Sequence, residues 1–262
     1  MDSKEGGMKL QVLGCSGGIG AGNRTTSLLL NDNLLIDAGT GVGDLGFDAL
    51  VKIDHVFLTH AHLDHIACLP LLLDTVAGSR NRPVTVHATQ ATIEVLQRHI
   101  FNWQIWPDFS TIPDSANALL RYQVLETGDE VILPGVTIRA LPALHTVPAV
   151  AYQLDSGTAS VVFSGDTDDC TPFWESVNAI ANLQTLIIET AFADHEETLA
   201  RASRHFTPRR LLAALGQLRH QVDIRITHLK PADHEQIMLE LLRDNGTNFA
   251  ISRLQTGQII TF

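Results

Sequence analysis

Four side chains of metal-binding type follow one apolar segment, and this cluster constrains the fold of the chain more than any other sequence feature. Ile53 to Leu58 is predicted to be a buried strand, and it is followed by the segment THAHLDH. Residues two apart in an extended chain point to the same side, so His60 and His62 can share one ion. Asp64 and His65 stand where a helix is predicted to begin, and they can reach a second ion. The pattern predicts a two-metal site at the end of a strand.

The alternative is a chance grouping of polar residues on a loop. Only 12 of the 262 residues are histidines, and four demanding positions within six residues speak against chance. Imidazole nitrogens and a carboxylate oxygen suit zinc, manganese or iron, so the motif alone does not select the metal. We expect two divalent ions, with Zn2+ as the first choice and Mn2+ or Fe2+ as alternatives.

Three further candidate ligands each follow a predicted strand: His145, Asp166 and His228. Open α/β sheets place their sites at the carboxyl ends of several strands, so a shared position after strands is expected of ligands. Taken singly, each residue has an ordinary alternative as a strand-terminal histidine or a turn aspartate. Together with the cluster around His60, they predict a complete two-metal site.

Composition limits the class of protein. The chain is 45% hydrophobic and 18% charged, which is typical of a globular enzyme with a sizeable core. No apolar run reaches the roughly 18 residues of a transmembrane helix, and we expect no membrane partner. The polar start, Met1 to Lys9, lacks the apolar part of a signal peptide, and Met8 is a second candidate for the natural start. Cys15, Cys68 and Cys170 form no CxxC pair and predict reduced thiols in a cytoplasmic protein.

The formal net charge of −11 argues against a protein that binds a nucleic-acid polymer, which needs a basic face. A small anionic substrate is still compatible with this charge, because bound metal ions reverse the sign of the local field. The charge therefore favours a small substrate over a polymer.

The chain alternates short apolar runs with segments of helical periodicity, and it has no low-complexity linker. This alternation predicts a single α/β domain over residues 1–262, with mixed sheets covered by helices. A lid-like insertion is expected near residues 102–120, because Asn102 to Pro113 is aromatic and aperiodic. Three of its rings could stack on a nucleobase or instead pack in a core or dimer contact: Trp103, Trp106 and Phe109.

Three expectations about individual elements bear on the site and the sheets. His65 to Val76 is predicted to be one continuous helix. Phe249 to Phe262 is predicted to close the chain with a pair of strands around Gly257. The glycine-rich stretch GCSGGIG after the first strand could suggest a dinucleotide site, but such a site needs a helix to follow, and an apolar strand follows here. We expect a flexible turn that can line the site.

The ligand pattern from His60 to His228 resembles the metallo-β-lactamase superfamily from end to end. Asp37, in the segment LLIDAG, matches the superfamily's structural aspartate, which braces the metal-bearing loop. The resemblance implies a four-layer αββα sandwich, the metallo-β-lactamase fold. The implied ligand groups are His60, His62 and His145 for one metal and Asp64, His65 and His228 for the other, with Asp166 bridging them.

Five segments narrow the resemblance to class II 3′,5′-cyclic-nucleotide phosphodiesterases: HAHLDHI, SGDT, ETAF, HFTP and THLKP. They span most of the chain. Cys68 stands where a small glycine or serine is expected beyond the histidine motif, and Pro70 interrupts the aliphatic run there. These departures leave the ligands in place and bear on the subfamily and its substrate.

Glu189 and His205 lie outside the ligand pattern and resemble the proton-handling pair of phosphodiesterase members of this superfamily. The tRNA 3′-processing nucleases share such a pair, and β-lactam hydrolases generally lack it. A histidine oriented by a carboxylate can protonate an alkoxide leaving group near neutral pH. The alternative is a capping glutamate and a surface histidine. Together with Asp64, these two are the candidate catalytic residues.

The resemblance thus implies a dinuclear phosphodiesterase that hydrolyses 3′,5′-cyclic nucleotides (cAMP or cGMP) to 5′-nucleotides. A tRNA 3′-processing nuclease is a second hypothesis, against which the acidic charge speaks. A thioester or lactam hydrolase is compatible with the fold. A third hypothesis is that the chain is not an enzyme but a metal-binding regulatory protein. Non-catalytic family members lose metal ligands, however, and this sequence retains every ligand of the pattern. The sequence also leaves a homodimer open.

Overall fold

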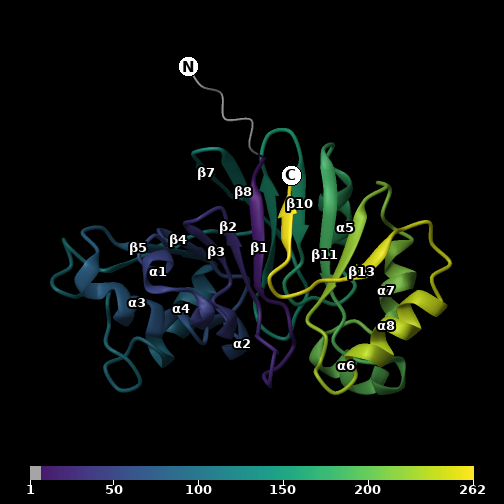
Figure 1. The fold of residues 1–262 in the computed structure, drawn as a ribbon, viewed down its shortest axis with the longest axis horizontal. Helices are drawn as coiled ribbons and strands as arrows, with labels where there is room; N and C mark the ends of the chain where they lie inside the picture. Colours follow the sequence, from purple (N-terminus) through teal and green to yellow (C-terminus); the bar gives the residue numbers. More distant parts are fainter. Residues whose placement is uncertain (1–6) are drawn as a thin grey trace.

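The computed structural model describes residues 7–262, so the question of the natural start falls largely outside the described residues. These residues form two mixed sheets of seven strands each (Figure 1). The first sheet has the order β14-β1-β2-β3-β4-β5-β6. Its strands are β1 (Lys9–Gly14), β2 (Ser27–Leu30), β3 (Leu34–Ile36), β4 (His55–Phe57), β5 (Val84–Ala88), β6 (Leu120–Val124) and β14 (Ile259–Thr261).

The second sheet has the order β13-β12-β11-β10-β9-β8-β7. Its strands are β7 (Glu130–Leu133), β8 (Val136–Pro142), β9 (Val150–Asp155), β10 (Ser160–Phe163), β11 (Leu183–Glu189), β12 (Asp223–Thr227) and β13 (Ile251–Arg253). In each sheet four neighbouring strands run parallel, from β3 to β6 and from β10 to β13, and the remaining pairs are antiparallel. The carboxyl ends of parallel strands lie at one edge of a sheet, and this edge positions the site.

Helices cover the outer faces of the two sheets, and Figure 1 shows them on either side of the sandwich. The α-helices are α1 (Phe47–Leu50), α2 (Leu63–Ile66), α3 (Leu69–Val76), α4 (Gln90–His99), α5 (Thr171–Asn178), α6 (Glu197–Ser203), α7 (Pro208–Leu215) and α8 (His234–Arg243). Three short 3-10 helices are η1 (Thr40–Asp44), η2 (Ala77–Ser79) and η3 (Asp194–Glu196). The expected αββα arrangement is confirmed.

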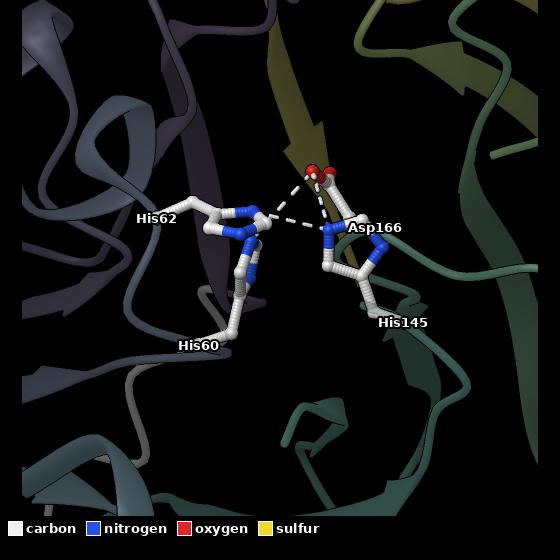
Figure 2. Close-up of side chains that lie close together, drawn as sticks. All are labelled: His60, His62, His145 and Asp166. Carbon is white, nitrogen blue, oxygen red and sulfur yellow. Dashed lines mark hydrogen bonds and ion pairs between the residues drawn. The ribbon is translucent and has the colours of Figure 1, made fainter. Parts of the chain in front are cut away.

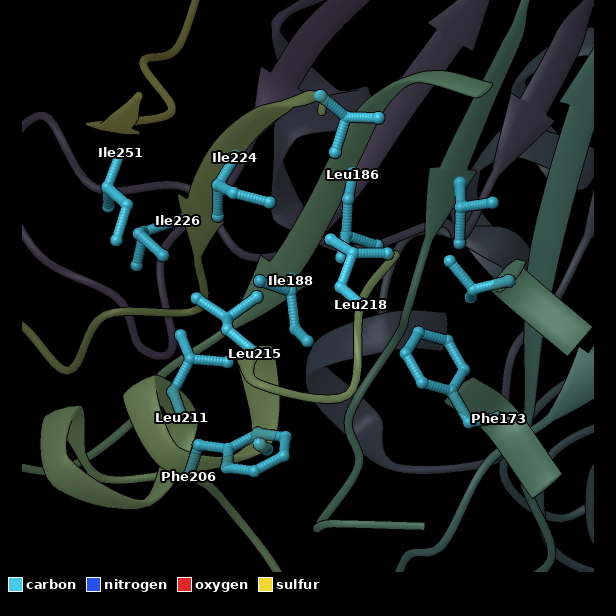
Figure 3. Packing of buried hydrophobic residues seen from close by; sticks show 14 of the residues in the cluster. Phe173, Leu186, Ile188, Phe206, Leu211, Leu215, Leu218, Ile224, Ile226 and Ile251 are labelled. Atoms are coloured by element: carbon cyan, nitrogen blue, oxygen red, sulfur yellow. The ribbon is translucent and has the colours of Figure 1, made fainter. Parts of the chain in front are cut away.

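Three buried clusters hold these layers together, because each sheet buries both faces. The central cluster joins the two sheets and includes Phe57 of β4 and Tyr152 of β9, whose rings meet edge to face. One outer cluster packs α3 and α4 on the first sheet, with Leu72 and Leu96 fully buried. The other packs α5, α7 and α8 on the second sheet, where Figure 3 shows side chains of α7 against those of β11 and β12. Both sheets are thereby fixed as a rigid frame for the loops at their edge.

The helix expected over His65 to Val76 is interrupted, because the chain forms α2 and then α3. The amide of Cys68 donates to the carbonyl of Ala38, outside the helix. Pro70 lies in the first turn of α3, where a missing amide proton costs least. The break leaves α2 as a short helical segment that carries two candidate ligands.

The strands β13 and β14 on either side of Gly257 are present, but the expectation that they pair with each other is wrong. β13 pairs with β12 in the second sheet, and β14 pairs with β1 in the first. The chain therefore crosses from one sheet to the other at its end. The strand β7 and the helices α5 and α6 were not expected; β7 is an edge strand in which Ile132 is exposed.

The segment between α4 and β6, where an insertion near residues 102–120 was expected, contains neither helix nor strand. Phe109 is buried in the outer core of the first sheet, Trp106 is half-buried against it, and Trp103 is 65% exposed. The segment enters β6 at its amino end, whereas the candidate ligands follow carboxyl ends. Phe109 is therefore a core residue, and a lid role for the segment stays a prediction.

Two further expectations concern the class of protein. Within residues 7–262, no helix has the length and apolar character needed to cross a membrane. The three cysteines of that range are unpaired thiols, as the absence of a CxxC pattern predicted.

Candidate metal centre

The structure brings all seven candidate ligands together at the carboxyl ends of strands. His60 and His62 follow β4, and Asp64 and His65 belong to α2, which starts directly after them. The other three follow β8, β10 and β12 of the second sheet: His145, Asp166 and His228. Both sheets therefore supply side chains to the same site.

His60, His62, His145 and Asp166 form a first group, whose ligand atoms all lie within 4.8 Å of one another (Figure 2). Nε2 of His145 is 3.1 Å from Nδ1 of His62. Oδ2 of Asp166 is 3.7 Å from Nε2 of His60 and 3.9 Å from Nε2 of His145. Donor atoms around one ion, each at roughly 2.0–2.2 Å from it, have separations of this order.

Asp64, His65, Asp166 and His228 form a second group within the same limit of 4.8 Å. Oδ1 of Asp166 is 3.3 Å from Nε2 of His65 and 3.3 Å from Nδ1 of His228. Oδ2 of Asp64 is 3.9 Å from Nε2 of His65 and 3.8 Å from Nε2 of His228. Asp166 thus contributes Oδ2 to the first group and Oδ1 to the second, which is the position of a bridging ligand.

Four polar atoms in these groups are buried and have no hydrogen-bond partner within residues 7–262: Nε2 of His60, Nε2 of His65, Nδ1 of His228 and Oδ1 of Asp166. Leaving such an atom unpaired costs about 1–3 kcal/mol, so native proteins rarely gather several of them in one place. A divalent cation in each group would satisfy all four. The residues present therefore fit a dinuclear metal centre, although the donor set does not identify the metal.

Asp37 and Thr59 fix the orientation of two of the imidazoles. Oδ2 of Asp37 is 2.7 Å from Nδ1 of His65, and Oδ1 of Asp37 accepts from the amide of Thr59 at 2.8 Å. The Thr59 hydroxyl donates to Asp37 and lies 3.0 Å from Nδ1 of His60, from which it can accept. An oxygen acceptor at Nδ1 keeps the proton there and leaves the Nε2 lone pair free for a metal. Asp37 is thus in the bracing position that the resemblance implied.

His145 is oriented in the same way by a backbone carbonyl, because its Nδ1 lies 3.2 Å from the carbonyl oxygen of Arg204. Burial lowers the pKa of His145 to about 4. Burial likewise lowers the pKa of His228 to about 3. Both side chains are therefore neutral imidazoles near neutral pH, which is the form that binds a metal.

Asp166 is presented by a glycine that no other residue could replace without strain. Gly165 has a φ of +57°, and a Cβ atom on it would lie 2.9 Å from Cγ2 of Thr59. Burial opposes the ionisation of Asp166, but the imidazoles of His228 and His65 outweigh it and hold the pKa of that carboxyl well below its usual value. Asp166 is therefore an anion between the two groups.

Glu189, the last residue of β11, and His205, between α6 and α7, form a buried pair beside both groups. Nδ1 of His205 is 2.7 Å from Oε1 of Glu189. The ring centroid of His205 lies 5.0 Å from that of His145 and 5.3 Å from that of His228. Since His205 is only 7% exposed, the alternative of a surface histidine is wrong. The pair can hold a proton next to the candidate metal centre.

The glycine-rich segment after β1 forms another side of the site. The carbonyl of Cys15 accepts from the amide of His228 at 2.8 Å, and the amide of Gly17 donates to the carbonyl of Leu229 at 3.0 Å. A Cβ atom on Gly17 would lie 2.4 Å from the His228 carbonyl oxygen, so this contact requires glycine. Nζ of Lys230 donates to the Gly17 carbonyl at 2.7 Å. The segment is a turn between antiparallel strands, as expected, and it lies against a candidate ligand.

Sequence reasoning missed the residues that hold the candidate ligands in place. Thr59 is the first residue of the segment THAHLDH, and Arg204 directly precedes His205, but the ligand pattern singled out neither residue. Arg210 was missed as well; its guanidinium donates to the carbonyl of His205 at 2.9 Å and pairs with Asp168. The only sequence signal for these three residues was that they stand close to candidate site residues along the chain.

A family model described as a beta-lactamase superfamily domain matches residues 32–228. This range covers most of the chain and ends at His228, the last of the candidate ligands. The chain therefore belongs to the β-lactamase superfamily. With its two His/Asp groups, it is a metal-dependent hydrolase of that superfamily.

Proteins similar to this chain carry different names. The chain is 26% identical over 303 residues to the "Probable 3′,5′-cyclic-nucleotide phosphodiesterase" of Yersinia pestis, with 94% of this chain and 87% of that protein covered. It is 25% identical over 279 residues to Ribonuclease Z of Methanopyrus kandleri, with 90% and 91% covered. The crystal structure of unliganded yeast PDE1 matches with a TM-score of 0.84 at 17% identity, covering 98% of this chain and 100% of that one. That last likeness concerns the fold.

Proposed function

We propose that the chain is a dinuclear metal-dependent phosphodiesterase that hydrolyses 3′,5′-cyclic nucleotides to 5′-nucleotides in the cytoplasm. The observation that carries the proposal is the buried Glu189–His205 pair, whose imidazole lies against those of His145 and His228. Hydrolysis of a diester expels an alkoxide, which needs a proton, whereas the thiolate of a thioester departs without one, and β-lactam hydrolases generally lack such a pair. The match to the Yersinia pestis protein supports the choice of a cyclic nucleotide.

In this proposal, His60, His62 and His145 hold one metal, Asp64, His65 and His228 hold the other, and Asp166 contacts both. The set of imidazoles and carboxylates suits Zn2+, with Mn2+ or Fe2+ as alternatives. When bound, the metal pair supplies Lewis acidity and lowers the pKa of water in the site. Both sheets contribute ligands, so we treat residues 1–262 as a single domain.

The chain's own residues handle the proton and the orientation of the substrate. Glu189 holds the Nδ1 proton of His205, which leaves Nε2 as the atom that passes a proton to the departing ribose oxygen. Asp64 has a side chain 29% exposed, unlike the nearly inaccessible Asp166, so it can face both a metal and the attacking water. We assign Asp64, Glu189 and His205 as the catalytic residues.

The substrate is proposed to be a small anion and not a nucleic-acid polymer. The formal net charge of −11 opposes the approach of a polyanion, while a single phosphodiester needs only the local field of two cations. The ribonuclease Z relatives make an RNA substrate the alternative to be tested.

The test is a substrate panel with protein whose metal content has been measured. It contains 3′,5′-cAMP, 3′,5′-cGMP, an aryl phosphodiester, a precursor tRNA, a thioester and a β-lactam, each with and without prior chelation. We expect metal-dependent turnover of a cyclic nucleotide to the 5′-monophosphate. Turnover of precursor tRNA with inert cyclic nucleotides would replace the proposal by a nuclease, and turnover of the lactam or thioester with inert diesters would refute both.

A further inference from the structure

We propose that Arg204 is a positioning residue that holds His145 in its ligand orientation and ties it to His205. Two hydrogen bonds run in opposite directions between Arg204 and His145, which are 59 positions apart. Nδ1 of His145 lies 3.2 Å from the Arg204 carbonyl oxygen. Nη1 of Arg204 donates to the His145 carbonyl oxygen at 2.7 Å. The same residue therefore fixes both the imidazole and the backbone of this candidate ligand.

The backbone of Arg204 is in a conformation that glycine usually adopts at the end of a helix. Arg204 ends α6 in the left-handed region, with φ 53° and ψ 57°. That conformation costs roughly 1–2 kcal/mol for a residue with a Cβ atom, and glycine is the residue that usually occupies it. Glycine would supply the carbonyl for His145 but could not supply the guanidinium. The arginine at this position is thus consistent with a role in holding His145.

Further hydrogen bonds join this contact into a closed ring around the site. Arg210 donates to the carbonyl of His205 at 2.9 Å and pairs with the carboxylate of Asp168. The amide of Asp168 donates to the carbonyl of Leu144 at 2.8 Å. Leu144 precedes His145, and Arg204 precedes His205, so the ring closes through the chain. The position of His145 is therefore coupled to that of His205 by two routes, one through Arg204 and the other through Arg210 and Asp168.

The expected consequence concerns the metal affinity of the first group. The carbonyl at Nδ1 keeps the proton on that nitrogen and makes Nε2 a better donor to a metal. Without the guanidinium, the left-handed turn loses its partner at His145 and the carbonyl is no longer held in place. Loss of such an outer contact typically lowers metal affinity by about 10- to 100-fold. The second group, which does not include His145, should be affected far less.

The inference rests on the ligand assignment of the proposed function, so the experiment tests the two separately. Arg204→Met is introduced into two parent variants: His228→Ala, which leaves the first group intact, and His145→Ala, which leaves the second. Zn2+ affinity is measured by competition with a chromophoric chelator. Arg204→Lys restores a donor to the His145 carbonyl. Arg209→Met is the matched control, since the side chain of Arg209 is 74% exposed and its guanidinium lies 3.8 Å from Oδ2 of Asp194.

We expect Arg204→Met to weaken Zn2+ binding by about 10- to 100-fold in the His228→Ala parent and by less than about 3-fold in the His145→Ala parent. Arg204→Lys should recover part of the loss, and Arg209→Met should cause none. The thermal midpoint of the metal-free protein should be the same with and without Arg204→Met. Unchanged affinity in the His228→Ala parent, or equal losses in both parents with a lower metal-free midpoint, would overturn the inference. A His228→Ala parent that still binds two ions would overturn the ligand assignment and this inference with it.

Discussion

Nδ1 of His205 lies 2.7 Å from Oε1 of Glu189, and both side chains are buried beside the candidate metal centre. The carboxylate is itself held, because the amides of Thr167 and Phe206 donate to its two oxygens. Burial alone would lower the pKa of His205, but the Glu189 carboxylate outweighs it and raises that pKa above its ordinary value. The Glu189 carboxylate thereby favours the protonated form of His205, which is the form that a general acid requires.

Replacing His205 should slow hydrolysis most for substrates whose leaving group must be protonated as it departs. For His205→Ala we expect kcat on a cyclic nucleotide to fall by about 100- to 10,000-fold. The loss on an aryl phosphodiester should be much smaller, since an aryloxide departs without protonation. Steady-state kinetics on both substrates, at matched metal content, measures the two losses. Equal losses would contradict the acid role.

Glu189→Gln tests whether the carboxylate acts through His205. The amide keeps the shape of the side chain but removes the charge that favours protonated His205. We expect a substrate-dependent loss of the same kind as for His205→Ala, and almost no further loss in the double variant. Additive losses would show that the two residues act independently.

Replacing Asp37 should weaken metal binding without touching a metal ligand. In Asp37→Asn, the NH2 group of the new side chain can donate a hydrogen bond but cannot accept one. It would face either the Nδ1 proton of His65 or the Thr59 hydroxyl, both of which now donate to Asp37. Either contact would favour, in His65 or in His60, the tautomer that carries its proton on Nε2. We expect Zn2+ affinity to fall by about 10- to 100-fold, measured by chelator competition. Asp48→Asn, in the exposed part of α1, is the control and should bind as the wild type does.

The grouping of the candidate ligands was predictable because five of the seven are histidines, a scarce residue type, and most of the seven closely follow the end of a strand. His60, Asp166 and His228 all follow apolar runs, and the sandwich brings such ends together. The role of Arg204 was not predictable, because its two hydrogen bonds with His145 both involve backbone carbonyl groups. Every residue has a backbone carbonyl, so the sequence does not mark the ones that matter. Only the folded chain reveals which carbonyls face a ligand.

The strands were predictable in kind but not in their partners. An apolar run indicates a strand without indicating which sheet it joins, so β13 and β14 were expected to pair although they belong to different sheets. The break between α2 and α3 depends on the bond from Cys68 to Ala38, a contact across 30 positions that helical periodicity does not contain. The edge strand β7 was missed because Ile132 points to solvent.

Gly165→Ala should destabilise the protein and disturb the site, because this glycine is both left-handed and crowded. A Cβ atom would lie 2.9 Å from Cγ2 of Thr59, whereas at Gly157, with φ +86°, nothing lies within 4 Å. Gly157→Ala is thus the control for backbone strain alone, with an expected cost of roughly 1–2 kcal/mol. Gly165→Ala should cost about 1–3 kcal/mol more through overpacking, and Thr59→Ser should recover part of it. Denaturant unfolding measures these differences; equal costs at the two glycines would contradict the crowding argument.

His87 should make the stability of the protein depend on pH, independently of the metal centre. Its ring is buried on β5, stacked on Phe57 with centroids 4.2 Å apart, and Nε2 lies 2.9 Å from Nδ1 of His55. Burial, reinforced by His55, lowers the pKa of His87 from 6.5 to about 3. In the unfolded chain, His87 binds a proton below about pH 6.5, whereas in the folded chain it does so only below about pH 3. The free energy of unfolding therefore decreases as the pH falls from about 6.5 to about 3.

From these two pKa values, His87 should account for about 2 kcal/mol of lost stability between pH 7 and pH 5. His87→Gln replaces the imidazole by an amide that stays neutral, so the unfolding free energy of this variant should decline less steeply with falling pH. Urea unfolding of metal-free wild type and variant across this range removes the contribution of metal release from the comparison. His99→Gln, at an exposed position in the last turn of α4, is the matched control and should keep the wild-type slope. A variant slope equal to that of the wild type would mean that the buried His55–His87 contact accepts the proton at little cost.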